Sequence, residues 1–145
     1  MDDGAIILAP VAGEAQLSDP AITGPFAPEM AVLAMVEQVE PWCGYLARRD
    51  GQPLGLGGVK APPDKDGAVE IGYLTFPKYE GTGVAKALTA AMIGIAKTNG
   101  ALSVIAHTLC AKNASTAVLF ASGFARNGDD IDPNESVVWR WRLTL

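Results

Sequence analysis

The hydrophobic pattern of this chain changes its period at a glycine-containing loop over residues 77–85. Before the loop, Val69, Ile71 and Tyr73 occupy every second position, which is typical of a strand with one buried face. After Gly83 the apolar residues follow a helical spacing and predict one buried helix face: Val84, Leu88, Met92 and Ile95. A strand that leads through glycines into a helix favours folds in which a sheet and helices share one core.

The remaining patterns predict further elements on both sides of this unit. Two short apolar segments flank a turn over residues 49–52 and predict a hairpin, and residues 68–76 predict a third antiparallel strand. The helix after the loop ends at Asn99-Gly100. The other expected elements are strands over residues 5–8, 42–48, 54–60, 102–108 and 137–143, a helix over residues 29–39, and a helix that opens at Asn113 or Ser115, buries Ala114, Ala117, Val118 and Ala121, and ends at Gly123. Together they predict an α+β fold with a mixed sheet.

Composition narrows the class of protein. With 145 residues, 49% of them hydrophobic, the chain suits one globular domain over residues 1–145. Its net charge of −5 argues against a nucleic-acid partner, because phosphate neutralisation needs concentrated Lys and Arg. Cys43, Cys110 and His107 are too few for a zinc site or a disulfide scaffold, so we expect no metal. The acidic start and the lack of a long apolar run favour a cytoplasmic protein without a membrane partner.

The glycine loop has the chemistry of an anion site. Gly81 and Gly83 have no Cβ, so backbone N–H groups can approach a phosphate at the start of the helix, where the helix dipole favours negative charge. By itself the pattern suits a tight turn equally well. It is neither a Rossmann fingerprint nor a nucleoside-triphosphate loop.

Several segments together resemble the GNAT N-acetyltransferase superfamily, in particular the branch related to the ribosomal-protein alanine acetyltransferases. The loop is similar to the family's acetyl-CoA signature, in which Arg or Gln precedes Gly-x-Gly-x-Ala. The Pro-Pro-Asp segment in residues 61–67 resembles a loop that members of that branch tend to carry. The resemblance runs over about residues 42–143 and includes the fourth strand, the strand that follows and the last helix: residues 69–73, 106–109, 114–119 and Gly123-Phe124. Two positions depart from the pattern, since Glu80 replaces the Arg or Gln and Lys112 replaces an Asn.

The resemblance implies a GNAT-like, mostly antiparallel sheet flanked by helices and splayed between its fourth and fifth strands. Acetyl-CoA would lie in the gap as acyl donor, its pantetheine arm paired with the backbone of Leu74, Thr75 and Phe76. Asn113 would cap the helix, contact the pantetheine arm, or both. The pyrophosphate would bind backbone amides of the loop and the helix start: Gly81, Thr82, Gly83, Val84, Ala85 and Lys86. Glu80 would repel a phosphate if it pointed inward, so we expect it to face solvent.

Acetyl transfer to an amine needs a group that takes a proton, because amines are protonated at neutral pH. Glu70 is the candidate, since alternation sets it on the face opposite Val69 and Ile71; the alternative is an exposed or structural carboxylate. His107 is a second candidate acid or base, against the commoner structural role.

Other residues near these candidates have simpler explanations. Cys110 suggests an acyl-cysteine mechanism, but no supporting His-Asp or His-Asn arrangement accompanies it, so we expect a small buried side chain. Trp139 and Trp141 could line the acceptor pocket, but aromatic residues at this spacing are first of all core.

The main hypothesis is a cytoplasmic N-acetyltransferase that transfers the acetyl group of acetyl-CoA directly to a primary amine, either a small molecule or a protein N-terminus. The alternative is a catalytically silent CoA-binding or interaction module. It is favoured by Glu80, by Lys112 and by the lack of a Tyr on the last helix, where Leu119 and Phe120 stand. A nucleotide-binding domain is a third hypothesis, and a homodimer is compatible with each of them.

Overall fold

The computed structural model describes residues 6–10, 40–131 and 135–145. Its strands are β1 (Ile7–Pro10), β2 (Gly44–Arg49), β3 (Gln52–Val59), β4 (Ala68–Thr75), β5 (Ser103–Thr108), β6 (Ala125–Ile131) and β7 (Val137–Thr144). The helices are η3 (Pro77–Tyr79), α3 (Val84–Thr98) and α4 (Ala114–Ala121). The helix expected over residues 29–39 lies outside the described residues.

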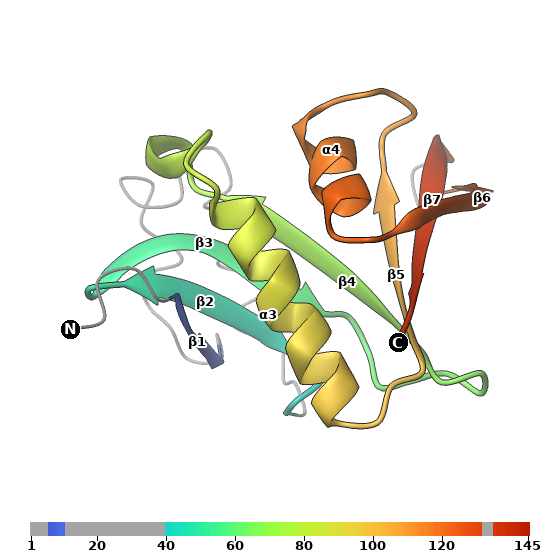
Figure 1. Cartoon of the computed structure of the whole chain (residues 1–145), viewed down its shortest axis with the longest axis horizontal. Helices are drawn as coiled ribbons and strands as arrows, with labels where there is room; N and C mark the ends of the chain where they lie inside the picture. The colour runs from blue at the N-terminus through green and yellow to red at the C-terminus, as the bar shows by residue number, and fades with distance from the viewer. Residues whose placement is uncertain (1–5, 11–39, 132–134) are drawn as a thin grey trace.

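The strands form one sheet in the order β1-β2-β3-β4-β5-β7-β6. Every neighbouring pair is antiparallel except β4 and β5, which run parallel. Pairing of β4 with β5 covers only residues 68–70 against residues 103–105, so the two strands separate beyond Glu70. Figure 1 shows them meeting near the C-terminus and diverging from there. The expected α+β fold, with a mixed and mostly antiparallel sheet splayed between its fourth and fifth strands, is confirmed.

The hairpin of β2 and β3 turns at Asp50-Gly51, which have φ angles of 52° and 80°. Two consecutive residues with positive φ form the type I′ turn, whose twist matches that of the paired strands. The turn expected over residues 49–52 is therefore present, and the flanking strands differ from their expected bounds by one or two residues.

Helix α3 packs on β3 and β4 and ends at the expected Asn99-Gly100, where Gly100 has a φ of 89°. It crosses one face of the sheet (Figure 1). Val84, Leu88 and Met92 are buried as the spacing predicts, and Ala96 takes the next place in the core because Ile95 is only half-buried.

Helix α4 begins after Asn113, which decides between the two expected starts. It buries Thr116 and Leu119. The expectation for its core face is wrong: Ala114, Ala117 and Ala121 are exposed, and Val118 is half-buried. Nearly all residues of α4 are small or apolar, so its sequence carries no stripe that distinguishes one face from another.

The sequence pattern does not predict β6, since residues 125–131 are rich in polar side chains and read as a loop. β6 forms the sheet edge beside β7, with a bulge between Arg126 and Asp129. Polar residues are tolerated there because an edge strand faces solvent. None of the helices in the described ranges is long and apolar enough to cross a membrane.

Candidate active site

Glu70 and His107 lie on β4 and β5 at the point where the sheet opens. Glu70 pairs with Ile105, the last pair of the parallel ladder, and His107 follows two residues later on the same face as Ile105. Glu70 Oε2 lies 2.9 Å from His107 Nδ1. The register thus joins the two candidates that the sequence gives only separately.

The pair belongs to a longer series of alternating charges. Lys60 Nζ donates to Glu70 Oε2 at 2.6 Å. On the other side, His107 Nε2 lies 2.7 Å from Asp130 Oδ2, and Arg140 Nη1 donates to Asp130 Oδ1 at 3.2 Å. The series runs from β3 across β4 and β5 to the hairpin of β6 and β7.

These neighbours set the protonation of each group. Partial burial acts to raise the pKa of the Glu70 carboxyl, but hydrogen bonds from Lys60 and His107, and the charges of both, hold that pKa below its usual value. Burial acts to lower the pKa of His107, but Asp130 and Glu70 outweigh it and raise that pKa. The hydrogen bond from His107 lowers the pKa of Asp130. Glu70 is therefore a carboxylate at neutral pH, held by two donors.

A cavity of about 720 Å³ surrounds this series. Its charged wall is formed by Lys60, Glu70, His107 and Asp130, and the rest of the lining is Thr108, Leu109, Asn113, Ser115, Ile131 and Val138. Leu109 and Ile131 are 69% and 65% exposed. These two apolar side chains therefore form part of the rim of the cavity, and charged side chains line its inner wall.

A second cavity, of about 500 Å³, lies over the glycine loop and the end of β4. Seven of the expected cofactor residues line it: Leu74, Thr75, Gly81, Gly83, Val84, Ala85 and Lys86. Tyr73 and Glu80 also line it, so Glu80 reaches the expected phosphate site although it is exposed. Ser115 lines both cavities, and the two therefore adjoin at the start of α4.

The start of α3 has free space and unpaired donors for an anion. Gly81 and Gly83 have φ angles of 76° and 84°, and a Cβ on either would meet nothing within 4 Å. Gly83 is the N-cap and provides no side-chain hydrogen bond, and the first N–H groups of a helix have no partner within it. The backbone amides of this turn fit a pyrophosphate. Thr82 lies exposed in the same loop, but its N–H donates to Tyr79 C=O at 3.3 Å, so this expected donor is already paired.

The backbone of β4 faces the gap at alternate residues. Phe76 N–H donates to Leu54 C=O at 2.9 Å, and Lys60 N–H donates to Glu70 C=O at 2.9 Å. Because alternate residues of an antiparallel pair direct both backbone groups to the partner, the even-numbered residues of β4 face β3. Of the three residues expected to pair with pantetheine, only Thr75 faces the gap, and Tyr73 is its neighbour there. Leu74 lines the cavity through its side chain, and Phe76 is fully buried.

Asn113 caps α4, as one of its two expected roles requires. Its Oδ1 accepts from Thr116 N–H at 3.0 Å, and its own N–H donates to Thr116 Oγ1 at 2.9 Å. This reciprocal arrangement is a capping box. Asn113 also lines the larger cavity.

Tyr73 connects β4 to α4 across the gap. Its hydroxyl lies 3.2 Å from both the backbone oxygen and Oγ of Ser115. Burial raises the pKa of this hydroxyl, which outweighs the opposing effect of the hydrogen bond with Ser115.

Among the neighbouring residues, one expectation is wrong. Cys110 is exposed, not buried, because it lies in the turn after β5, where its thiol lies 3.4 Å from Val137 C=O. Trp141 is part of the core, as expected, and Trp139 packs against it. Both also line a cavity of about 580 Å³ that shares Asn113 with the cavity around Glu70. In the described part of the chain, no group of three or more His, Cys, Asp or Glu side chains is placed to hold a metal ion.

Sequence reasoning missed Lys60, Asp130 and Arg140. Lys60 was only the end of an expected strand, and Asp130 lies on the strand that the pattern does not predict. The one available signal was the half-exposed pattern of β7, with Arg140 between two tryptophans, which implies a polar partner strand beside it.

A model described as the acetyltransferase (GNAT) domain matches residues 14–125. The chain belongs to the GNAT acetyltransferase family. This family uses acetyl-CoA as its acyl donor. The donors and open space at the start of α3 fit that group.

Solved acetyltransferase structures share the fold of this GNAT chain. An N-acetyltransferase from Staphylococcus aureus aligns with a TM-score of 0.73 and 16% identity, over 97% of this chain and 99% of that one. RimL, a ribosomal alpha-N-protein acetyltransferase in complex with coenzyme A, gives 0.62 and 19%, over 70% and 61%. RimJ of Mycobacterium smegmatis, also in complex with a CoA disulfide, gives 0.64 and 20%, over 70% and 52%. The GNAT chain thus spans less than two thirds of RimL and RimJ. No curated protein sequence matches it significantly.

Proposed function

We propose that this GNAT protein is an N-acetyltransferase that transfers the acetyl group of acetyl-CoA directly to a primary amine of a small molecule or a protein N-terminus. The proposal is supported above all by the ionised Glu70 carboxylate in the cavity of about 720 Å³, which we call the acceptor cavity. At Ser115 it adjoins the cavity of about 500 Å³ over the glycine loop, which we call the cofactor cavity. RimL, which shares the fold, is an alpha-N-protein acetyltransferase by name, and this supports an amine as acceptor.

Acetyl-CoA supplies an activated acetyl group. The backbone amides of Gly83 to Lys86 would hold its pyrophosphate at the start of α3. Tyr73 and Thr75, which direct backbone groups into the gap along the edge of β4, would pair with its pantetheine arm. Asn113, beside that gap, orients α4 and contacts the arm. The N–H groups of this edge are also the donors that polarise the thioester carbonyl.

Glu70 and His107 manage the proton of the acceptor amine. Glu70 accepts the proton, since its carboxylate is ionised and lines the cavity proposed to receive the amine. His107 Nδ1 lies against Glu70 and Nε2 against Asp130, so an imidazole with Nδ1 unprotonated can accept the proton from Glu70 at Nδ1 and pass its Nε2 proton to Asp130. Asp130 has a side chain that is 38% exposed and can release the proton to water.

The Tyr73 hydroxyl is the donor that this site offers to the leaving thiolate. It lines the cofactor cavity, and its raised pKa keeps it protonated at neutral pH. The thiolate needs only modest help, because thiols ionise near neutral pH. This role replaces the acid that the last helix lacks, where Leu119 and Phe120 stand.

The rival function is a silent CoA-binding module. The specific observation in its favour is Glu80, a carboxylate on the lining of the cavity that would receive the phosphates. Lys86 lines the same cavity and offsets this charge in part.

Calorimetry with acetyl-CoA, CoA and ATP tests the cofactor site. We expect both CoA species to bind at micromolar concentrations and ATP to bind far more weakly. Absence of CoA binding would reject the enzyme and the silent module together. Release of free thiol over a panel of amines and N-terminal peptides then separates these two, since only the enzyme turns over.

A further inference from the structure

Lys60 carries a primary amine into the proposed acceptor cavity. Its side chain leaves the end of β3 and passes over Gly72 of β4, where Lys60 Cε lies 3.6 Å from the position that a Cβ would occupy. The Lys60 stem thus runs close over Gly72, at a separation that a Cβ there would meet as an ordinary van der Waals contact. At its end, Nζ lies 2.6 Å from Glu70 Oε2.

The chemistry of Lys60 matches that of the proposed acceptor. Both are primary amines that must lose a proton before they attack a carbonyl carbon. Glu70, the proposed base, is already the hydrogen-bond partner of Nζ and is close enough to take that proton directly. Lys60 thus occupies the place that a bound acceptor ammonium would take.

The Lys60 side chain is also free to move. It is 60% exposed, and exposed ion pairs hold long side chains only weakly. The four-carbon stem can therefore turn Nζ away from Glu70 and toward the gap beside β4. Gly72 lies between Glu70, where the strands separate, and Leu74, which lines the cofactor cavity.

We propose that Lys60 is a self-acetylation site of this protein. The inference rests on the proposed function. Glu70 takes one proton from the Lys60 ammonium, the freed Nζ attacks the thioester carbonyl carbon, a C–N bond forms, and the C–S bond breaks. The products are one N-acetylated lysine and the CoA thiolate, which regains a proton from the site or from water. No oxidant or further reactant is needed.

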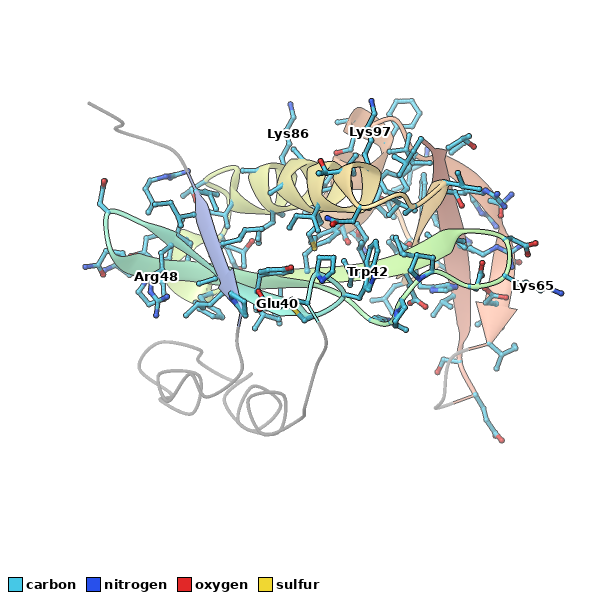
Figure 2. The ribbon with its side chains drawn as sticks, turned by 90° about the horizontal axis from the view of Figure 1, so that it is seen from below. Glu40, Trp42, Arg48, Lys65, Lys86 and Lys97 are labelled. Atoms are coloured by element: carbon cyan, nitrogen blue, oxygen red, sulfur yellow. The ribbon has the colours of Figure 1, made fainter. Side chains whose placement is uncertain are left out.

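Other lysines serve as internal references. The chain has six: Lys60, Lys65, Lys78, Lys86, Lys97 and Lys112. Lys65 and Lys97 are exposed and line neither of the two adjoining cavities. Figure 2 shows Lys97 pointing away from the sheet on the outer side of α3, and Lys65 at the far end of the molecule. Their acetylation reports the spontaneous reaction with acetyl-CoA.

The experiment incubates the full chain with acetyl-CoA alone and follows the protein by intact mass and peptide mapping. We expect one acetyl group to appear on Lys60 at least about tenfold faster than on Lys65 or Lys97, because a positioned amine reacts as an intramolecular group. The rate constant should not change with protein concentration. Lys60→Arg should abolish the fast phase, Lys97→Arg should leave it intact, and Glu70→Gln should slow it without changing acetylation of Lys65.

Three results would overturn the inference. Lys60 could react no faster than Lys65 and Lys97, its rate could rise with protein concentration, or Glu70→Gln could leave it unchanged. If amines in solution are still acetylated in these cases, the proposed function stands and only self-acetylation fails. If neither Lys60 nor any added amine is acetylated although CoA binds, the proposed function fails as well.

Discussion

Glu70 is held by a lysine and a histidine, and its replacement should remove a proton acceptor more than a binding contact. We predict that Glu70→Gln lowers kcat at least about a hundredfold, the usual contribution of a positioned base. Affinity for CoA should change little, because Glu70 lines the acceptor cavity and not the cofactor cavity. Thiol release gives kcat, and calorimetry gives the affinity.

The matched control is Asp66→Asn, the same change of charge on an exposed loop residue away from both cavities. It should leave kcat and CoA affinity as they are. Unchanged turnover in Glu70→Gln would remove Glu70 as the base, whereas an equal fall in CoA affinity would place it at the cofactor.

His107 links the site to the pH dependence of stability. Its pKa is raised in the folded protein, so the folded state holds the proton more tightly than the unfolded state does. The resulting stabilisation is complete below the unfolded pKa of about 6.5 and is lost as pH rises through the folded pKa. We predict that the free energy of unfolding of the wild type exceeds that of His107→Gln most at about pH 6, and by less at about pH 9.

Urea unfolding of both proteins across this range measures the difference. A gap that stays constant with pH, or that widens toward alkaline pH, would show that the imidazolium is not what Glu70 and Asp130 stabilise.

At the scale of single elements, the start of α3 should respond to charge. Asp and Asn both tolerate the positive φ of Gly83 and differ only by one negative charge. We predict that Gly83→Asp weakens CoA binding roughly tenfold relative to Gly83→Asn, or ~1.4 kcal/mol. Calorimetry of the two variants measures this ratio, and equal affinities would mean that the pyrophosphate lies elsewhere.

The cap of α4 should contribute to stability on its own. Asn113→Ala removes the acceptor of the Thr116 N–H, and we predict that the free energy of unfolding falls by ~1 kcal/mol. Asn113→Asp keeps an accepting oxygen and should restore most of the loss. If thermal or urea unfolding showed Ala and Asp to be equivalent, the capping box would not stabilise the helix.

The sequence predicted some helices and strands better than others, because only an element that buries one face along its length carries a regular apolar pattern. α3 was predicted almost to the residue because one face, with Leu88 and Met92, is buried along its whole length. β6 was not predicted, since an edge strand with Asp129 and Asp130 needs no apolar pattern. α4 has no distinct apolar face, so its start was predicted from its cap and its buried face was not.

At the scale of the whole molecule, the site depends on contacts between residues far apart in the chain. Glu70 and His107 were identified from local pattern and from family resemblance, but their 2.9 Å contact follows from the register of a parallel strand pair. Asp130 reaches His107 through an edge strand that joins the sheet beside β7. No local periodicity encodes such pairings, and therefore the sequence predicted neither the contact between Glu70 and His107 nor the place of Asp130 beside them.

In the proposed function, the splayed sheet gives one fold room for two substrates. Beyond Glu70 the strands separate, and the proposed cofactor site follows one edge of β4 while the proposed acceptor site lies at the facing side chains of β4 and β5. Direct transfer between two such adjoining cavities requires neither a metal nor a nucleophilic side chain.

The central claim is direct transfer from acetyl-CoA to an amine at Glu70, and the balance of its products tests that claim most directly. The measurement quantifies free CoA thiol and N-acetylated amine in the same reaction, for the wild type and Glu70→Gln, with the best amine from the panel. We predict equal amounts of the two products in the wild type and a parallel loss of both in Glu70→Gln. Thiol release without an acetylated amine, or undiminished amide formation by Glu70→Gln, would contradict it.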